Sequence, residues 1–126
     1  MPVIIKTPTT RLDQAAFGKI AHEVMQCIFA IHNEFGRFFD ERIYQQEFAR
    51  RVPHTQLEVP IQVIFENFRK TYFIDALVET GAVFEFKTVD SLVARHRSQL
   101  LNYLLLAELS HGKLVNMRTE RCYTNS

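Results

Sequence analysis

Apolar side chains recur at spacings of three and four residues in two long stretches of the chain. The first stretch covers residues 12–35 and is followed by Gly36, a residue type that often comes directly after the last turn of a helix. The second stretch covers residues 92–109 and is followed by Gly112. Because this spacing places the apolar side chains along one side of a helix, the pattern predicts two long amphipathic helices, each ended by its glycine.

A shorter helix is expected between them. Asp40 is a suitable N-cap residue, because its side chain can accept a hydrogen bond from the first helical turn. Pro53 cannot continue a helix and places the end near Arg51. The apolar positions in this segment are less regular, so we expect a helix with a mixed surface.

Four further stretches rich in apolar residues predict β-strands, at residues 56–65, 70–79, 82–89 and 113–117. Pro60 places the first strand at an edge of the sheet, because proline has no N–H to donate. Short turns join the first three strands into an antiparallel meander. The fourth strand follows the second long helix, so it joins the sheet by a crossover. The pattern predicts an α/β fold in the order helix, helix, three strands, helix, strand.

Size and composition fit a single domain. The chain has 126 residues, of which 47% are hydrophobic and 23% charged, so it can bury one core. Its first ten residues include two prolines and three threonines, which indicates a loose arm or a short edge segment. We therefore expect an arm at residues 1–10 and one domain at residues 11–126.

Charge, cysteine content and the lack of long apolar segments indicate the partners and the cellular location to expect. The formal net charge is only +1, so any basic surface must be local. Cys27 and Cys122 are far apart and do not resemble a secreted disulfide framework, so we expect both to be reduced. No segment reaches the roughly 18 apolar residues that span a bilayer, and the first residues lack the pattern of a signal peptide. These features predict a cytoplasmic protein with no membrane partner.

Charged residues inside the apolar strands are the unusual feature of the sequence. Asp75 lies in the middle strand of the meander, and Glu85 and Lys87 lie in the next strand. Because side chains alternate along a strand, Glu85 and Lys87 share one face while Phe84 and Phe86 share the other.

Two interpretations of these charges remain open. In the first, the sheet has one solvent-exposed face on which Asp75 pairs with a neighbouring charge. In the second, the charged groups are buried and need a compensating partner, for which a divalent metal ion is suitable. Mg²⁺, or Mn²⁺ in its place, binds carboxylate and carbonyl oxygens, so Asp75, Glu85 and the backbone carbonyl of Phe86 are candidate ligands. Lys87 would then orient a water molecule or stabilise charge on a phosphate.

The order of these residues resembles a known family. The matching positions are Gly36, Glu41-x-x-Tyr44, Asp75, Glu85-x-Lys87 and Gln99-Leu-Leu-Asn-Tyr-Leu104. They are similar to the PD-(D/E)XK nuclease-like superfamily, and within it to the bacterial GxxExxY proteins, from about residue 17 to residue 117. The chain departs from that family at Phe38, where a second glycine is usual, and it ends at Ser126, where relatives often continue.

The resemblance implies a restriction-endonuclease-like core of helix, three-stranded meander, helix and strand, with an additional helix near the N-terminus. It also implies that Glu41 approaches the metal from its helix and that Gln99 faces the site from the later helix. From the residues alone, Tyr44 is expected to be a buried packing residue with a hydrogen-bonded hydroxyl. Gln99 is equally compatible with a solvated helix position.

Two functions are compatible with these residues and their order. The first is a metal-dependent nuclease that hydrolyses phosphodiester bonds in DNA, with Asp75, Glu85 and Lys87 as its main residues. The second is a catalytically silent module that keeps the same fold and binds nucleic acid or a protein. Because the chain is small and nearly neutral, a homodimer or a protein partner could complete its binding surface.

Overall fold

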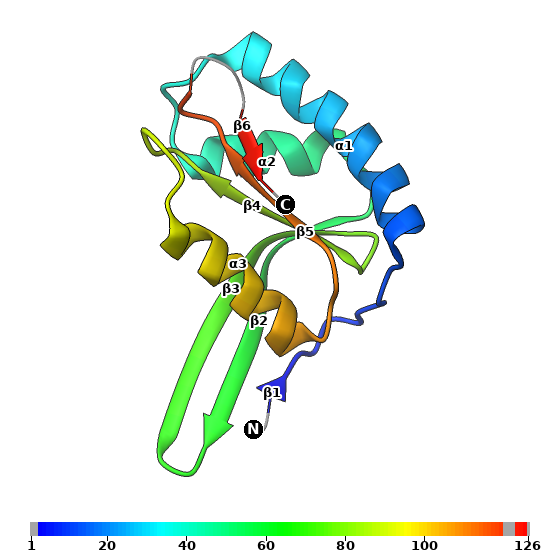
Figure 1. Ribbon diagram of the computed structural model, residues 1–126, viewed down its shortest axis with the longest axis vertical. Helices are drawn as coiled ribbons and strands as arrows, with labels where there is room; N and C mark the ends of the chain where they lie inside the picture. Colours follow the sequence, from blue (N-terminus) through cyan, green and yellow to red (C-terminus); the bar gives the residue numbers. More distant parts are fainter. Residues whose placement is uncertain (1–2, 120–122, 126) are drawn as a thin grey trace.

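In the part of the chain that the computed structural model describes, residues 3–119 and 123–125, six strands form one mixed sheet in the order of the sequence (Figure 1). The expected state of Cys122 lies outside these residues. Neighbouring strands are antiparallel except β4 and β5, which are parallel. The strands are β1 (Val3–Ile4), β2 (Thr55–Phe65), β3 (Phe68–Val78), β4 (Ala82–Lys87), β5 (Gly112–Asn116) and β6 (Tyr123–Asn125). This mixed α/β architecture confirms the predicted fold class.

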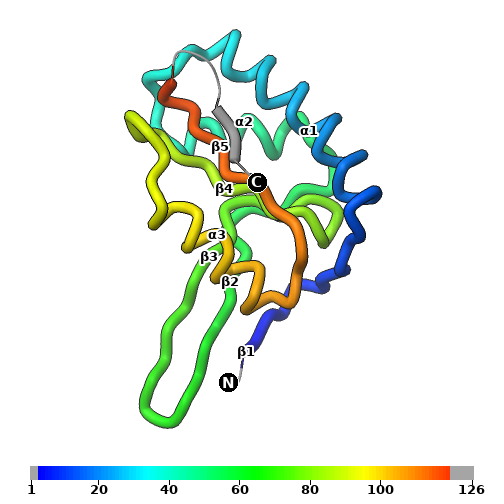
Figure 2. Tube along the Cα trace, in the orientation of Figure 1, coloured from blue at the N-terminus to red at the C-terminus, as the bar shows by residue number. Residues whose placement is uncertain are grey.

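Helices cover both faces of the sheet (Figures 1 and 2). Helices α1 (Gln14–Phe35) and α2 (Glu41–Arg51) pack on one face, and their buried side chains form a cluster with Phe84 and Phe86 of β4. Helix α3 (Ala94–Ala107) packs on the other face, in a second cluster with residues of β2, β3, β4 and β5. It connects β4 to the parallel strand β5, as the crossover prediction required.

The starts of α1 and α2 are fixed by aspartate caps. Asp13 accepts a hydrogen bond from the Ala16 N–H, and Asp40 accepts one from the Ile43 N–H. Each bond satisfies an N–H group that has no partner within its helix. The N-cap predicted at Asp40 is confirmed.

The end predicted for α3 is wrong. Glu108, with φ of 56° and ψ of 37°, already adopts the left-handed conformation that ends the helix, so Gly112 is instead the first residue of β5. Gly112 is suited to this place because a Cβ atom there would lie 2.9 Å from Leu100 Cδ1 and 3.0 Å from the Val83 carbonyl oxygen.

Both edges of the sheet are short strands. At one edge, β1 pairs with Val63 and Gln62 of β2, so residues 1–10 include a short edge strand. Among the described residues, these are the only β2 positions that β1 covers, so the edge position predicted from Pro60 holds at Pro60 itself but not for the whole of β2. At the other edge, β6 pairs with β5 and lies beyond residues 113–117, the last strand that the sequence pattern predicted. Strand β6 was not predicted because it is defined by its backbone pairing with β5, and its sequence carries no apolar pattern.

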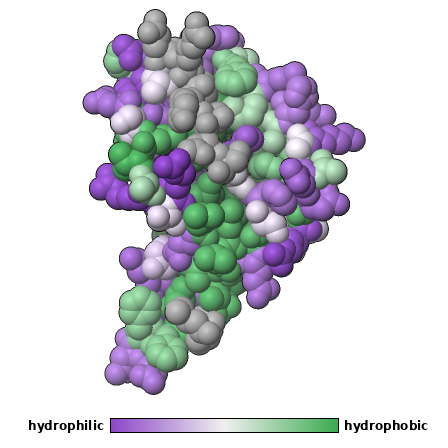
Figure 3. Space-filling model, viewed as in Figure 1, coloured by the Kyte–Doolittle hydropathy of each residue, from purple (hydrophilic) through white to green (hydrophobic). Residues whose placement is uncertain are grey.

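The distal halves of β2 and β3 form a hairpin that projects away from the helices (Figures 1 and 2). Its turn is Glu66-Asn67, between the paired residues Phe65 and Phe68. Figure 3 shows that apolar side chains continue from the body of the molecule onto this projection. Among the described residues, no helix is long and apolar enough to cross a membrane.

Candidate active site

Two carboxylates replace the backbone ladder where β3 and β4 separate. The regular pairing of these strands ends at Ala76 and Phe84. Beyond it, the Asp75 N–H donates to Glu85 Oε2 at 2.7 Å, and the Phe86 N–H donates to Asp75 Oδ2 at 2.9 Å. Each strand thus supplies a side-chain acceptor for a backbone N–H of the other, and this reciprocal pair fixes the two carboxyl groups next to each other.

Glu85 is buried and Asp75 is partly buried, so the interpretation with one solvent-exposed face is wrong. Glu85 is only 2% exposed, because β4 is covered by α1 and α2 on one face and by α3 on the other. Its neighbours Phe84 and Phe86 pack on the α1 and α2 side, whereas Lys87 contacts α3, so the predicted alternation along β4 is confirmed.

Burial changes the acidity of the pair. Burial, followed by the neighbouring negative charge of Asp75, raises the pKa of Glu85 to about 9. Burial likewise raises the pKa of Asp75 to about 6. The positive charge of Lys87 favours both carboxylates but does not offset their desolvation. The site therefore holds more potential negative charge than its own cations compensate.

A chain of hydrogen bonds from α3 holds the lysine. Lys87 Nζ donates to Gln99 Oε1 at 2.9 Å, and Gln99 Nε2 donates to the Tyr103 hydroxyl at 2.8 Å. Gln99 and Tyr103 lie four residues apart and so share one side of the helix. Gln99 therefore contacts the lysine, and it is not a freely solvated helix position.

Glu41, the first residue of α2, reaches the same region from the other face. It lines a cavity of about 480 Å³ together with Asp75 and Glu58. Its Oε2 atom accepts a hydrogen bond from Thr88 Oγ1 at 3.4 Å. The loop before it is held by Tyr44, which is buried and donates its hydroxyl proton to the Gly36 carbonyl at 2.6 Å, as expected for a packing residue.

The donor set fits a hard divalent cation that keeps water ligands. The hydrogen bonds to the backbone use Asp75 Oδ2 and Glu85 Oε2, and the second oxygen of each carboxylate takes no part in them. Among residues 3–119 and 123–125, no three His, Cys, Asp or Glu side chains are placed to hold a metal. An ion such as Mg²⁺ needs only one or two carboxylates when water and phosphate oxygens complete its shell.

Glu58 is a residue of this region that the sequence pattern did not reveal. It lies in β2 opposite Asp75. These two residues do not pair, although Leu57 pairs with Ala76 on one side of them and Val59 pairs with Ile74 on the other. Its φ of 52° is left-handed, a conformation that costs a non-glycine residue free energy. Its negative charge also contributes to the raised pKa values of Asp75 and Glu85.

We expect Glu58→Gly to stabilise the protein by about 1 kcal/mol, because glycine adopts this φ without a Cβ clash and the substitution removes a charge from the acidic cavity. Urea unfolding measures the change. Gln56→Gly is the matched control, since Gln56 lies in the same strand and is not among the residues with positive φ. The control should lose about 1 kcal/mol. An equal loss in both variants would contradict the account of Glu58.

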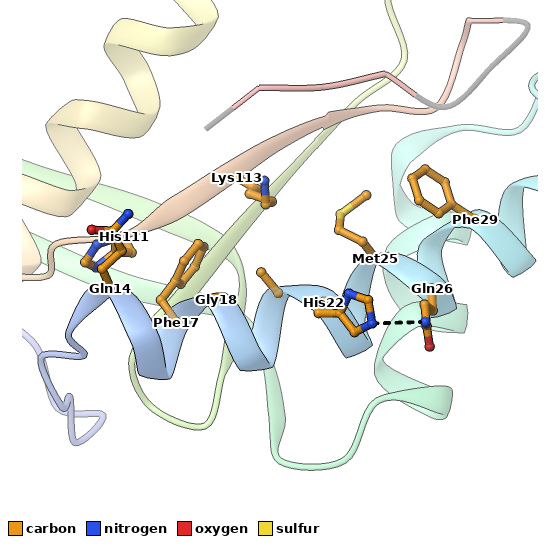
Figure 4. Close-up of a pocket in the computed structure, with 10 residues that line it drawn as sticks. Gln14, Phe17, Gly18, His22, Met25, Gln26, Phe29, His111 and Lys113 are labelled. Carbon is orange, nitrogen blue, oxygen red and sulfur yellow. Dashed lines mark hydrogen bonds between the residues drawn. The ribbon is translucent and has the colours of Figure 1, made fainter.

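A larger cavity, of about 790 Å³, lies along α1 and β5 (Figure 4). Apolar side chains such as Phe17 and Met25 line it, and a contact between His22 Nε2 and Gln26 Nε2 crosses part of its wall at 3.3 Å. Asp75, Glu85 and Lys87 do not line this cavity. The candidate active site is therefore separate from it.

A comparison with known families agrees with this geometry. The model of the PD-(D/E)XK nuclease superfamily matches residues 18–125. No curated protein and no solved structure matched the chain. Nucleases of this superfamily act on nucleic acids and typically use divalent metal ions. The match covers β2, β3, β4, α3 and β5, which carry or support the paired carboxylates and the lysine, and the chain belongs to the PD-(D/E)XK nuclease superfamily.

Proposed function

We propose that the protein is a metal-dependent nuclease that hydrolyses phosphodiester bonds in DNA. The observation that carries this proposal is the reciprocal pair of Asp75 and Glu85, with Lys87 on the same strand as Glu85. Such a pair gives a divalent cation two anionic ligands, and the lysine gives a phosphate a positive neighbour.

Asp75 and Glu85 would hold Mg²⁺, or Mn²⁺ in its place, and the Phe86 carbonyl is proposed as a further ligand. When bound, the ion would supply charge stabilisation at the phosphate and a more acidic water molecule. The raised pKa values of both carboxyl groups support this assignment, because they indicate a site whose full negative charge requires an added cation.

Lys87 would stabilise negative charge that develops on the phosphate or orient the attacking water molecule. Gln99 would position it, since its amide oxygen accepts a hydrogen bond from Lys87 Nζ while its amide nitrogen donates one to the Tyr103 hydroxyl. Glu41 would support the site from the cavity that it shares with Asp75.

Within the superfamily we propose membership of the GxxExxY group. The turn before Glu41 supports this despite the replacement of a glycine by Phe38. Phe38 is 77% exposed and does not need a positive φ, whereas Gly36 has a φ of 76°. The turn thus requires glycine at position 36, where the chain has one, and does not require it at position 38.

The test is nicking of supercoiled plasmid and cleavage of labelled single strands, each with Mg²⁺, Mn²⁺ or a chelator. We expect cleavage with either metal and none with the chelator. A folded protein that binds metal and nucleic acid but cuts neither substrate would refute the nuclease and support the binding module.

A further inference from the structure

The projecting hairpin is a continuation of the two strands that carry Asp75 and Glu58. Strand β3 runs from Phe68 at the turn to Asp75 at the site without interruption. At about 3.3 Å per residue, the tip of the hairpin lies about 23 Å along the strand from Asp75. The hairpin therefore has a defined position relative to the carboxylates.

The tip of the hairpin exposes aromatic rings. Phe65 and Phe68 are cross-strand partners beside the turn, and they are 53% and 51% exposed. A third phenylalanine, Phe73, is 48% exposed further along β3. Side chains of this size are normally buried, so the exposed pair Phe65 and Phe68 beside the turn indicates a contact surface.

Positive charge accompanies these rings. Arg69 and Lys70 follow Phe68 directly and are both exposed, and Lys70 Nζ lies 4.8 Å from the centre of the Tyr72 ring. The opposite end of the ribbon faces the cavity lined by Glu41, Glu58 and Asp75, where three carboxyl groups outnumber the single cation Arg42 and repel phosphates in the absence of metal. A polyanion that reaches this site thus needs a cationic contact elsewhere, and the hairpin offers one.

We propose that the hairpin binds an unpaired segment of nucleic acid beside the site of cleavage, with Phe65 and Phe68 stacking on bases and Arg69 and Lys70 contacting phosphates. This inference rests on the proposed function and specifies its substrate. Phenyl rings cannot read base edges by hydrogen bonds, but they stack on any base that is not already paired and stacked. Exposed rings with basic residues beside them thus fit a single strand better than an apolar protein surface.

The experiment measures the binding of fluorescently labelled oligonucleotides of about 20 nucleotides, as single strands and as duplexes, by anisotropy in chelator so that nothing is cut. Phe65→Ala/Phe68→Ala should weaken single-strand binding about tenfold and duplex binding less. Arg69→Gln/Lys70→Gln should reduce the steepness with which affinity falls with salt, by about 1.4 in the log–log slope for a single strand.

Further variants separate stacking from folding and from general apolar contact. Phe65→Tyr/Phe68→Tyr keeps both rings and should bind as the wild type does. Phe65→Leu/Phe68→Leu keeps apolar bulk without rings and should bind as weakly as the alanine variant. The control Phe29→Ala/Leu105→Ala removes two exposed apolar side chains from α1 and α3 and should bind normally.

The inference is overturned if the alanine variant binds as tightly as the wild type, or if the wild type binds neither form of nucleic acid. It is also overturned if the variant changes only the size of the protein in gel filtration, which would assign the hairpin to contacts between protein chains. Cleavage in Mg²⁺ or Mn²⁺ tests the proposed function separately. Cleavage that is indifferent to the hairpin variants would remove this inference alone, whereas hairpin-dependent binding without cleavage would remove the nuclease alone.

Discussion

Lys87→Ala should lower metal-dependent cleavage about 10²- to 10³-fold, the usual loss when one preorganised donor to a developing negative charge is removed. The side chain is held at its place by Gln99 and belongs to the same strand as Glu85. Its removal leaves both carboxylates and their hydrogen bonds to the backbone of the neighbouring strand intact. The measurement is the initial rate of plasmid nicking with protein in excess over plasmid, at a fixed metal concentration.

Two controls make this result specific. Lys19→Ala removes an exposed lysine from α1 and should cleave at the wild-type rate. Calorimetric titration of the Lys87→Ala protein with Mn²⁺ should still show binding, because Lys87 is not among the proposed ligands. A Lys87→Ala protein that cuts at the wild-type rate would exclude the lysine from the reaction, and one that no longer binds metal would assign it a role in building the site.

The candidate site residues could be selected from the sequence because they are charged residues within apolar strands. Asp75, Glu85 and Lys87 interrupt apolar strands, and charged groups in such places need partners. The alternation along β4 also predicted which side of that strand Glu85 and Lys87 occupy. The burial of Glu85 could not be predicted from the sequence, because it depends on the packing of α3 against the sheet.

Glu58 was missed because its sequence context looks ordinary. The neighbouring residues Leu57 and Val59 are apolar, so Glu58 fits the solvent side of a regular alternation. In the structure, Leu57 packs with the α1 and α2 cluster while Val59 packs with the α3 cluster, so the strand changes face at Glu58. A pattern with period two cannot reveal a backbone irregularity that leaves the pairing register unchanged on both sides.

The hairpin shows the same limit at a larger scale. Its strands were predicted from their apolar residues, but a strand pattern does not say whether a helix will cover it. Helix α3 is too short to reach the turn, which leaves Phe65 and Phe68 exposed. Buried and exposed positions of these strands therefore carry the same residue types, and only the tertiary structure distinguishes them.

Glu85→Gln should stabilise the metal-free protein at pH 8 by on the order of 3 kcal/mol while removing metal binding. Glutamine stays neutral at every pH, and its amide oxygen can still accept the Asp75 N–H that Glu85 Oε2 accepts. In the wild type, the raised pKa means that the folded state keeps its proton while the unfolded state loses it. Stability contributed by this group is thus present below its ordinary pKa of 4.5 and is lost as pH rises towards about 9.

The measurement is urea unfolding in chelator at several pH values from about 5 to 9, the window over which Glu85 is linked to folding. The wild type should lose stability across this range, and Asp75, with its pKa of about 6, should add to the loss at the acidic end. Glu85→Gln should show a much shallower decline, and the exposed control Glu23→Gln should follow the wild type.

Mn²⁺ should restore stability to the wild type at pH 8 and leave Glu85→Gln unchanged. The reason is that a bound cation removes the cost of burying the Glu85 carboxylate, and the variant has no carboxylate at this position. Parallel curves for wild type and Glu85→Gln would mean that Glu85 is ionised and already compensated in the folded protein, which would remove the electrostatic reason for a metal between the two carboxylates.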